Sequence, residues 1–156
     1  MDDESKIILI SLLKNSKIAS LGTSKDNQPF VSMVAYSHSP NFSEFYIHVS
    51  QLAVHTKNIL ENDKVSLMIC QSDYQTKNPN TLARVTITGK AFIIEKSDEN
   101  FASIKQTYLE KNPTAEMLFN LGDFQIFKIE VDQARYVAGF AKTFSLSKKS
   151  LENLIR

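Results

Sequence analysis

The segment from Arg84 to Ile94, with the sequence RVTITGKAFII, is dense in β-branched and aromatic side chains. Such side chains favour extended backbone, so the segment is predicted to form one strand of unusual length. Gly89 lies inside it, and a glycine within a strand is typical of a bulge or of a bend at the corner of a barrel. The segment therefore indicates a sheet that curves.

The rest of the chain reads as short elements separated by turn residues. Strands are expected at 17–23, 30–36, 44–49, 64–70, 124–131 and 135–146, helices at 4–14, after Ser50, from Ser97 to Asn112 and after Ser147, and the longest loop at 72–81. Six to seven strands, mostly neighbours in sequence with few helices between them, favour an antiparallel barrel over a doubly wound sheet. We predict a mainly β fold with flanking helices (α+β), in a single domain over residues 1–156, because no linker divides the chain.

The charges of the chain nearly cancel. It has 18 Lys and Arg residues against 17 Asp and Glu residues, which leaves no basic field for nucleic acid or for an acidic membrane. The longest apolar run, Ile7–Ile10, is too short to cross a bilayer, and Met1–Glu4 lacks the positive flank of a secretory signal. We expect a cytoplasmic protein with a small-molecule substrate and no nucleic-acid or membrane partner.

Several sequence motifs of catalysis and cofactor binding are absent. The sequence contains no G-x-G-x-x-G, no G-x-x-x-x-G-K-[ST], no H-E-x-x-H and no C-x-x-C. His38, His48 and His55 have no spacing that suggests a shared metal ion, and the single cysteine, Cys70, cannot build a multi-thiolate site. No metal site is therefore predicted.

The segment Ser50–Asn58, SQLAVHTKN, lies between two expected strands and opens a short helix. The first amides of a helix have no internal partner, and the helix dipole makes that end partly positive, so a phosphorylated cofactor can dock there. His55, Thr56 and Lys57 fall in the opening turns. The alternative is that Ser50 caps the helix, as serine does in many proteins, while His55 and Lys57 face water.

Five segments carry a family resemblance, namely Asn27–Tyr36, Phe45–Ser50, His55–Asn58, Val65–Met68 and Arg84–Ala91. In order and spacing they resemble the FMN-binding split barrel of the pyridoxamine 5'-phosphate oxidases and their relatives. The ending, Lys128–Glu130 with Arg135–Ala141, is similar to the haem-utilisation branch of that superfamily, of the HugZ and HutZ type. The resemblance covers most of the chain.

This resemblance implies a split β-barrel and a homodimer with FMN sites at the subunit interface. The flavin-contacting strand of the family falls on Ser32–Ser37, which marks Ser32, Met33 and Val34 as cofactor-binding residues. The family has an arginine and a lysine where this sequence has Ser32 and Ser37, and its Ser-Arg-Lys phosphate triplet falls on Ala53–His55. Because a phosphate is held largely by charge-assisted hydrogen bonds, other residues have to replace these cations.

The replacements that we predict are His55, Thr56 and Lys57 at the helix start, with Ser50 before them, Arg84 and Lys142. Arg84 falls where the family places a polar flavin contact, and Lys142 reaches across from the last strand. The alternative for Arg84 is an ion pair with Glu95 or Glu130, because a buried arginine without an anion is unfavourable. The sequence leaves both readings of Arg84 open.

Three functional hypotheses follow from the resemblance. The first is an FMN-binding oxidoreductase of unknown substrate, in which the cofactor supplies the chemistry and no catalytic side chain stands out. The second is a haem-binding or haem-degrading protein. The family's iron ligand is a histidine beyond the last strand, whereas this sequence has no histidine after His55, although other groups also bind haem iron. The third is a flavin carrier without catalytic turnover.

Overall fold

The computed structural model of the protein describes residues 1–74 and 78–155. Its helices are α1 (Asp3–Asn15), α2 (Val54–Glu61), α3 (Phe101–Lys111) and α4 (Lys148–Glu152), with 3-10 turns η1 (Pro79–Thr81), η2 (Pro113–Asn120) and η3 (Asn153–Ile155). Its strands are β1 (Ile18–Lys25), β2 (Gln28–His38), β3 (Glu44–Ser50), β4 (Lys64–Cys70), β5 (Arg84–Ile94), β6 (Phe124–Val137) and β7 (Thr143–Ser147). Part of the predicted loop 72–81, residues 75–77, lies outside the described residues.

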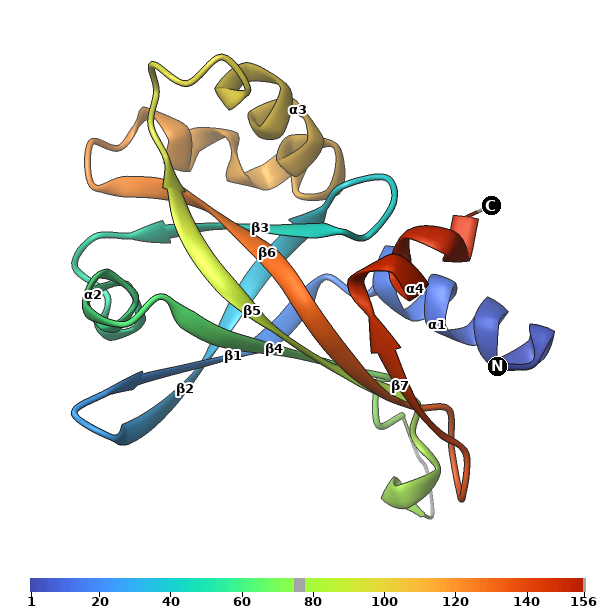
Figure 1. The fold of residues 1–156 in the computed structure, drawn as a ribbon. Helices are drawn as coiled ribbons and strands as arrows, with labels where there is room; N and C mark the ends of the chain where they lie inside the picture. The colour runs from blue at the N-terminus through green and yellow to red at the C-terminus, as the bar shows by residue number, and fades with distance from the viewer. Residues whose placement is uncertain (75–77, 156) are drawn as a thin grey trace.

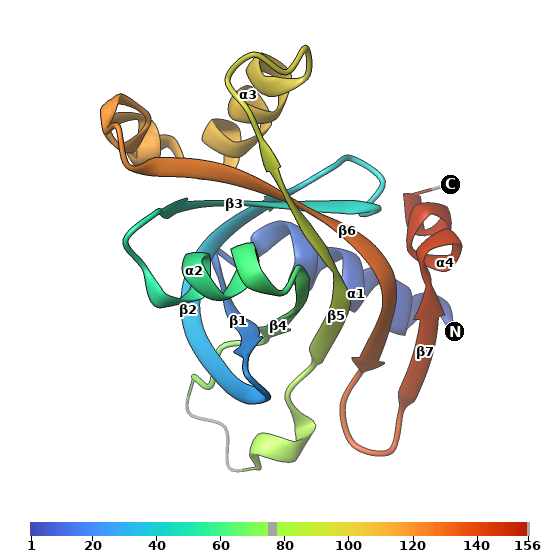
Figure 2. The same cartoon turned by 60° about the vertical axis from the view of Figure 1, so that its left-hand side comes forward.

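The strands form one antiparallel sheet in the order β3-β2-β1-β4-β5-β6-β7, and pairing between β3 and β6 closes it into a barrel of six strands (Figures 1 and 2). β7 is an extra strand outside the closed ring, paired with β6. Closure pairs β3 with β6 along an edge that an open antiparallel sheet would leave exposed. The predicted α+β class, with six to seven antiparallel strands in a barrel, is confirmed.

The long strand β5 bends at Gly89, as its sequence predicts. The register between β5 and β6 shifts at Thr88/Gly89, and a Cβ atom on Gly89 would collide with the carbonyl oxygen of Glu130. The absence of a side chain thus allows the two longest strands to lie against each other through the bend.

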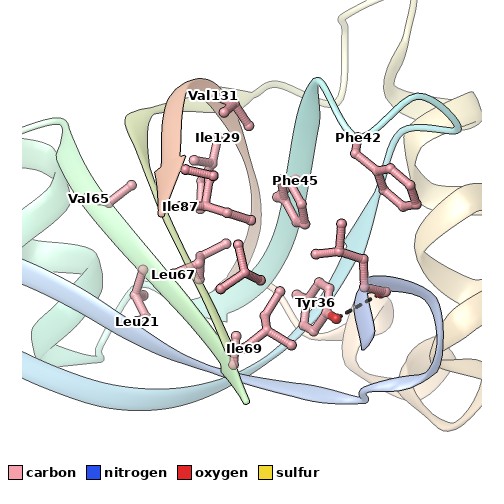
Figure 3. Packing of buried hydrophobic residues seen from close by; sticks show 14 of the residues in the cluster. Leu21, Tyr36, Phe42, Phe45, Val65, Leu67, Ile69, Ile87, Ile129 and Val131 are labelled. Atoms are coloured by element: carbon pink, nitrogen blue, oxygen red, sulfur yellow. Dashed lines mark hydrogen bonds between the residues drawn. The ribbon is translucent and has the colours of Figure 1, made fainter. Parts of the chain in front are cut away.

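The barrel interior is a continuous apolar core. Alternate residues of the strands point inward and are almost fully buried, among them Leu21, Tyr36, Phe45, Leu67, Ile87 and Ile129 (Figure 3). Tyr36 brings a hydroxyl into this core and donates it to the carbonyl of Leu13 over 2.9 Å, which ties α1 to the barrel. The core therefore contains a buried polar group that has its partner.

A second, smaller apolar cluster lies outside the barrel, where α3 and η2 cover β3 and β6. Its buried members are Tyr46, Ile94, Ile104, Tyr108, Ala115 and Ile126. Both faces of β3 are consequently buried, one in the barrel and one under α3. Figure 1 shows α3 above the ends of β5 and β3.

The end of the chain differs from the sequence prediction. We predicted one strand at 124–131 and another at 135–146, but β6 runs unbroken through residue 137 and β7 begins only at Thr143. The turn between them contains Gly139 at φ 128° and Ala141 at φ 64°, in the left-handed region that strands do not use.

None of the helices in the described part of the chain combines the length and apolar character needed to cross a membrane. Cellular location stays a prediction.

Candidate functional site

The barrel is split along β2. Residues 28–35 of β2 pair only with β1, and β3 joins β2 only at Tyr36–His38. Ser32, Met33 and Val34 therefore lie where β2 has one neighbour instead of two. Ser32 and Val34 face inward, whereas Met33 points outward and is 65% exposed. The predicted cofactor-contacting residues thus lie on a strand edge whose other side is open to a ligand or a partner.

Helix α2 lies over β1 and β2 and begins without a side-chain cap. Its N-cap residue is Ala53, which has no side chain that could bond the first amides. The alternative that Ser50 caps α2 is wrong, because Ser50 ends β3 three residues earlier. The Ser50 hydroxyl donates to Asp123 over 2.7 Å and accepts the amide of Leu52 over 3.1 Å. Ser50 shapes the turn, and the start of α2 keeps its positive end unsatisfied by a side chain.

His55 joins this helix start to β2. Its Nδ1 lies 3.0 Å from the Ser32 hydroxyl, and its Nε2 is buried without a hydrogen-bond partner among the described residues. The alternative that His55 faces water is therefore also wrong. Burial lowers the pKa of His55, so that the ring is neutral near pH 7. In a neutral imidazole one nitrogen carries a proton and the other has a free lone pair. If Ser32 donates to Nδ1, Nε2 can donate a hydrogen bond to an anion. If Ser32 accepts from Nδ1, Nε2 offers its lone pair.

The other predicted residues of α2 have different environments. Thr56 is fully buried and donates its hydroxyl to the Ser50 carbonyl over 2.6 Å, whereas Lys57 is exposed. Asn58 was not predicted from the sequence as a site residue; it is buried and donates to the Thr23 hydroxyl of β1 over 3.1 Å. Its position one turn after His55, on the inward face of the helix, was the available signal. Thr56 and Asn58 hold α2 in place, which leaves His55 and Lys57 for a ligand.

Arg84 and Lys142 lie elsewhere. β1 and β4 separate β2 from β5 in the sheet, so one copy of the chain does not place Arg84 beside Ser32. The alternative of an ion pair is wrong too. Arg84 donates to the Leu82 carbonyl over 3.1 Å, and Glu130 lies opposite Lys90 and bonds Lys128 over 2.8 Å.

Lys142 lies in the turn after β6, not in a strand. Its Nζ lies 3.5 Å from Glu4 and 3.7 Å from Asp2, both at the start of α1. This residue is half exposed, so each pair contributes little stability and leaves the lysine free to exchange partners.

The site thus combines an uncapped helix start, a neutral imidazole and an open strand edge. Among residues 1–74 and 78–155, no group of three or more His, Cys, Asp or Glu side chains could hold a metal ion by itself. The arrangement suits an anionic, flat cofactor that brings its own chemistry, and offers at most one nitrogen ligand to a metal already held in such a cofactor.

Comparison with known proteins places this geometry in a family. The model of the CREG β-barrel family matches residues 8–151. The chloroplastic haem oxygenase HOZ of Arabidopsis thaliana is 35% identical over 119 residues, which cover 76% of this chain and 35% of that protein. The haem oxygenase HutZ of Vibrio cholerae is 23% identical over 116 residues, covering 74% of this chain and 66% of HutZ. The chain thus spans about a third of the first relative and just under two thirds of the second.

Solved structures agree on the fold. A haem-binding protein from Mycobacterium smegmatis superposes with a TM-score of 0.81 at 22% identity, over 97% of this chain and 59% of that one. A protein of the pyridoxinephosphate oxidase family from Clostridium acetobutylicum, related to general stress protein 26, superposes with a TM-score of 0.71 at 18% identity. The superposition covers 97% of this chain and 99% of that one. The resemblance to the split barrel of the pyridoxamine 5'-phosphate oxidases, and within it to the haem-utilisation branch, is confirmed.

Proposed function

The chain belongs to the CREG β-barrel family, and on that premise we propose that it binds haem at the split of the barrel, beside His55. The observation that carries the proposal is the imidazole of His55, which Ser32 orients through Nδ1 while Nε2 has no partner among the described residues. Imidazole is a common ligand of haem iron, and ligating histidines usually bond a second group through the other nitrogen. The names of the two curated relatives support haem as the ligand.

The other two histidines fit this role less well. His38 Nδ1 lies 2.9 Å from the Ser39 carbonyl, and its ring packs 4.7 Å from that of Phe42. His48 lies under α3, on the opposite side of β3 from the barrel. His55 is the histidine beside the open edge of β2, and it takes the place of the later histidine that the family resemblance implies and this sequence lacks.

The test is a haemin titration followed in the Soret region. We expect one haem per chain. His55→Ala should weaken haem binding by at least about tenfold, and its Soret spectrum should no longer be that of a haem with a nitrogen ligand. Added imidazole should restore that spectrum in the variant, and His48→Phe should bind as the unchanged protein does. An unchanged spectrum and affinity in His55→Ala would remove His55 from the proposal.

Haem breakdown is the further step that we propose from the relatives' names. The reaction is carried by haem, oxygen and a reductant, while the protein orients the ring and limits access of water. Loss of the Soret band under ascorbate and air, compared between the loaded protein and free haemin, tests it. If the two decays match, the chain holds haem without degrading it.

FMN is a second candidate, and the start of α2 is the observation that favours it. Anions bind at the unsatisfied amides of a helix start, and both Lys57 and His55 are at hand for a phosphate. Replacing both by alanine should weaken FMN binding by about 1.5–3 kcal/mol per lost charged hydrogen bond. A yellow protein would support an FMN-binding oxidoreductase of unknown substrate. Bound FMN that no donor reduces would support the flavin carrier.

We further propose that the ligand site is shared in a homodimer. Val31 and Met33 are 68% and 65% exposed on the outer face of β2, next to the open strand edge. Beside them, a surface hollow of about 570 Å³ lies over the small residues Gly22 and Ser66. An exposed apolar surface with a hollow of this kind is typical of an interface, and a partner placed here could supply Arg84 or Lys142 to the split.

A further inference from the structure

A cavity of about 310 Å³ lies outside the barrel, under the cap that α3 and η2 form over β3 and β6. Its walls include the rings of Phe101, Phe119 and Phe124, and Lys96 and Ser97 stand at its polar side. The volume is at the lower end of the range for small-molecule pockets, which are mostly apolar with a few polar groups. The cavity can therefore enclose a small ring system.

His48 lines this cavity and is 7% exposed. Its ring stacks on Phe119, with the ring centroids 3.8 Å apart and the planes at 8°, and Phe124 lies 5.2 Å away. The Nδ1 atom of His48 is buried and has no hydrogen-bond partner within residues 1–74 and 78–155. Buried polar atoms are nearly always paired, so an unpaired imidazole in an aromatic cavity indicates a missing partner.

The imidazole of His48 is uncharged at neutral pH. Burial, and secondarily the nearby Lys105, lower its pKa to about 4. A neutral imidazole offers one donor and one acceptor nitrogen. The Nζ atom of Lys105 lies 4.9 Å from the centre of the Phe119 ring. The cavity thus presents flat apolar walls, a polar side that includes Glu95 and Lys96, and the neutral imidazole of His48.

We propose that this cavity binds a small planar heteroaromatic molecule of one or two fused rings, which packs against the phenylalanine rings and hydrogen-bonds to His48. Aromatic walls favour a flat guest, and the volume of the cavity limits its size. The unpaired imidazole nitrogen requires a ring or substituent that can donate or accept a hydrogen bond. The site is separate from the split beside His55, because His48 lies on the face of β3 opposite to that of Ile47 and Val49, which line the barrel core.

The test uses three probes of similar size that differ in hydrogen bonding. Indole carries a donor N–H, quinoline carries an acceptor nitrogen, and indene has neither. The chain contains no tryptophan, so indole fluorescence can report binding directly, and calorimetry serves for the other two. We expect indole or quinoline to bind one per chain and about tenfold more tightly than indene, because only they pair with His48. Equal binding of all three, or no binding at millimolar concentration, overturns the proposal.

Two variants locate the site. His48→Phe keeps the stacked ring and removes the nitrogens, so it should abolish the preference for the heteroaromatic probe over indene. Gly122 lines the cavity, and a Cβ there would meet no atom within 4 Å, so Gly122→Leu should fold normally and exclude all three probes. His55→Ala should leave binding unchanged. A preference that survives in His48→Phe, or binding lost in His55→Ala and kept in Gly122→Leu, contradicts the assignment.

Discussion

At the scale of single residues, the buried His48 and the half-buried His55 are two neutral histidines in different settings. Ser32 orients His55 beside an open strand edge, whereas His48 is stacked on Phe119 and its buried Nδ1 has no hydrogen-bond partner among the described residues. Burial lowers the pKa of both. A buried, neutral histidine couples folding to protonation, because the unfolded chain takes up a proton at a higher pH than the folded one.

The first prediction is that His48 makes stability fall on the acid side. With a folded pKa of about 4 and an ordinary value of 6.5, its contribution is complete above pH 6.5 and is lost as the pH falls toward 4. Between pH 7 and pH 5 the loss from this residue is about 2 kcal/mol. His48→Phe should therefore be at least as stable as the unchanged protein at pH 7 and show a smaller loss at pH 5. Urea unfolding at both pH values measures it, and parallel losses in the two proteins would contradict it.

At the scale of elements, helix α2 is held firmly along its length and left open at its start. Thr56 and Asn58 bond the turn before it and β1, respectively, while Ala53 leaves the first amides uncapped. An uncapped start is less stable than a capped one, by about 1 kcal/mol. The open start is thus consistent with a site that an anion completes.

The second prediction concerns a cap at this start. Ala53→Ser and Ala53→Asp should each stabilise the empty protein by about 1 kcal/mol, because both side chains can bond the first amides. If an anionic cofactor uses those amides, Ala53→Asp should bind FMN or haem more weakly than Ala53→Ser, since it adds a negative charge. Thermal melts and ligand titrations of the pair measure both effects. Equal affinities would place the anion elsewhere.

The third prediction concerns the bend in β5. Gly89→Ala would drive a Cβ into the Glu130 carbonyl, a backbone atom that cannot turn aside, so it should destabilise the protein by about 2 kcal/mol or more. Gly122→Ala is the matched control. A Cβ there meets nothing within 4 Å, so its effect should be within about 1 kcal/mol and can be stabilising. Similar unfolding midpoints for the two variants would show that the bend tolerates a side chain.

The order of the elements was predictable from the sequence, because the strands are rich in β-branched residues and turn-forming residues separate them. The bulge at Gly89 could be predicted because a glycine inside a strand is typical of a bulge. The break after Val137 was missed, since Tyr136–Phe140 has strand-like composition and only the left-handed backbone of Gly139 and Ala141 ends the strand. Such a break depends on the turn that the neighbouring strands require.

The candidate site could be predicted only in part. His55 was found because a strand followed by a short helix exposes helix amides in a known place. Ser50 was misassigned because three residues of turn separate it from α2, which composition does not reveal. Arg84 was placed correctly on a strand, but strand periodicity tells which face a residue occupies and not which side of a closed barrel it reaches.

At the scale of the whole molecule, the barrel is closed by hydrogen bonds yet has one strand, β2, with a free edge over residues 28–35. Exposed apolar side chains gather at this edge, and the predicted replacement cations lie elsewhere, Arg84 on β5 and Lys142 in the turn after β6. A second copy of the chain is the simplest way to cover the edge and to complete the cofactor site with Arg84 or Lys142. Dimerisation and ligand binding should then depend on the same residues.

The fourth prediction tests that dependence. Val31→Lys places a charge on the outer face of β2 at a position 68% exposed, so it should leave the fold intact and convert a dimer into monomers. Ile7→Lys is the matched control, because Ile7 is 66% exposed on α1, away from β2. Light scattering gives the mass of each variant, and haemin and FMN titrations give its affinity. If the site is shared, Val31→Lys should weaken ligand binding along with association, and Ile7→Lys should change neither. A monomeric Val31→Lys that still binds its ligand normally would show that one chain holds the whole site, and that Arg84 and Lys142 do not contribute to it.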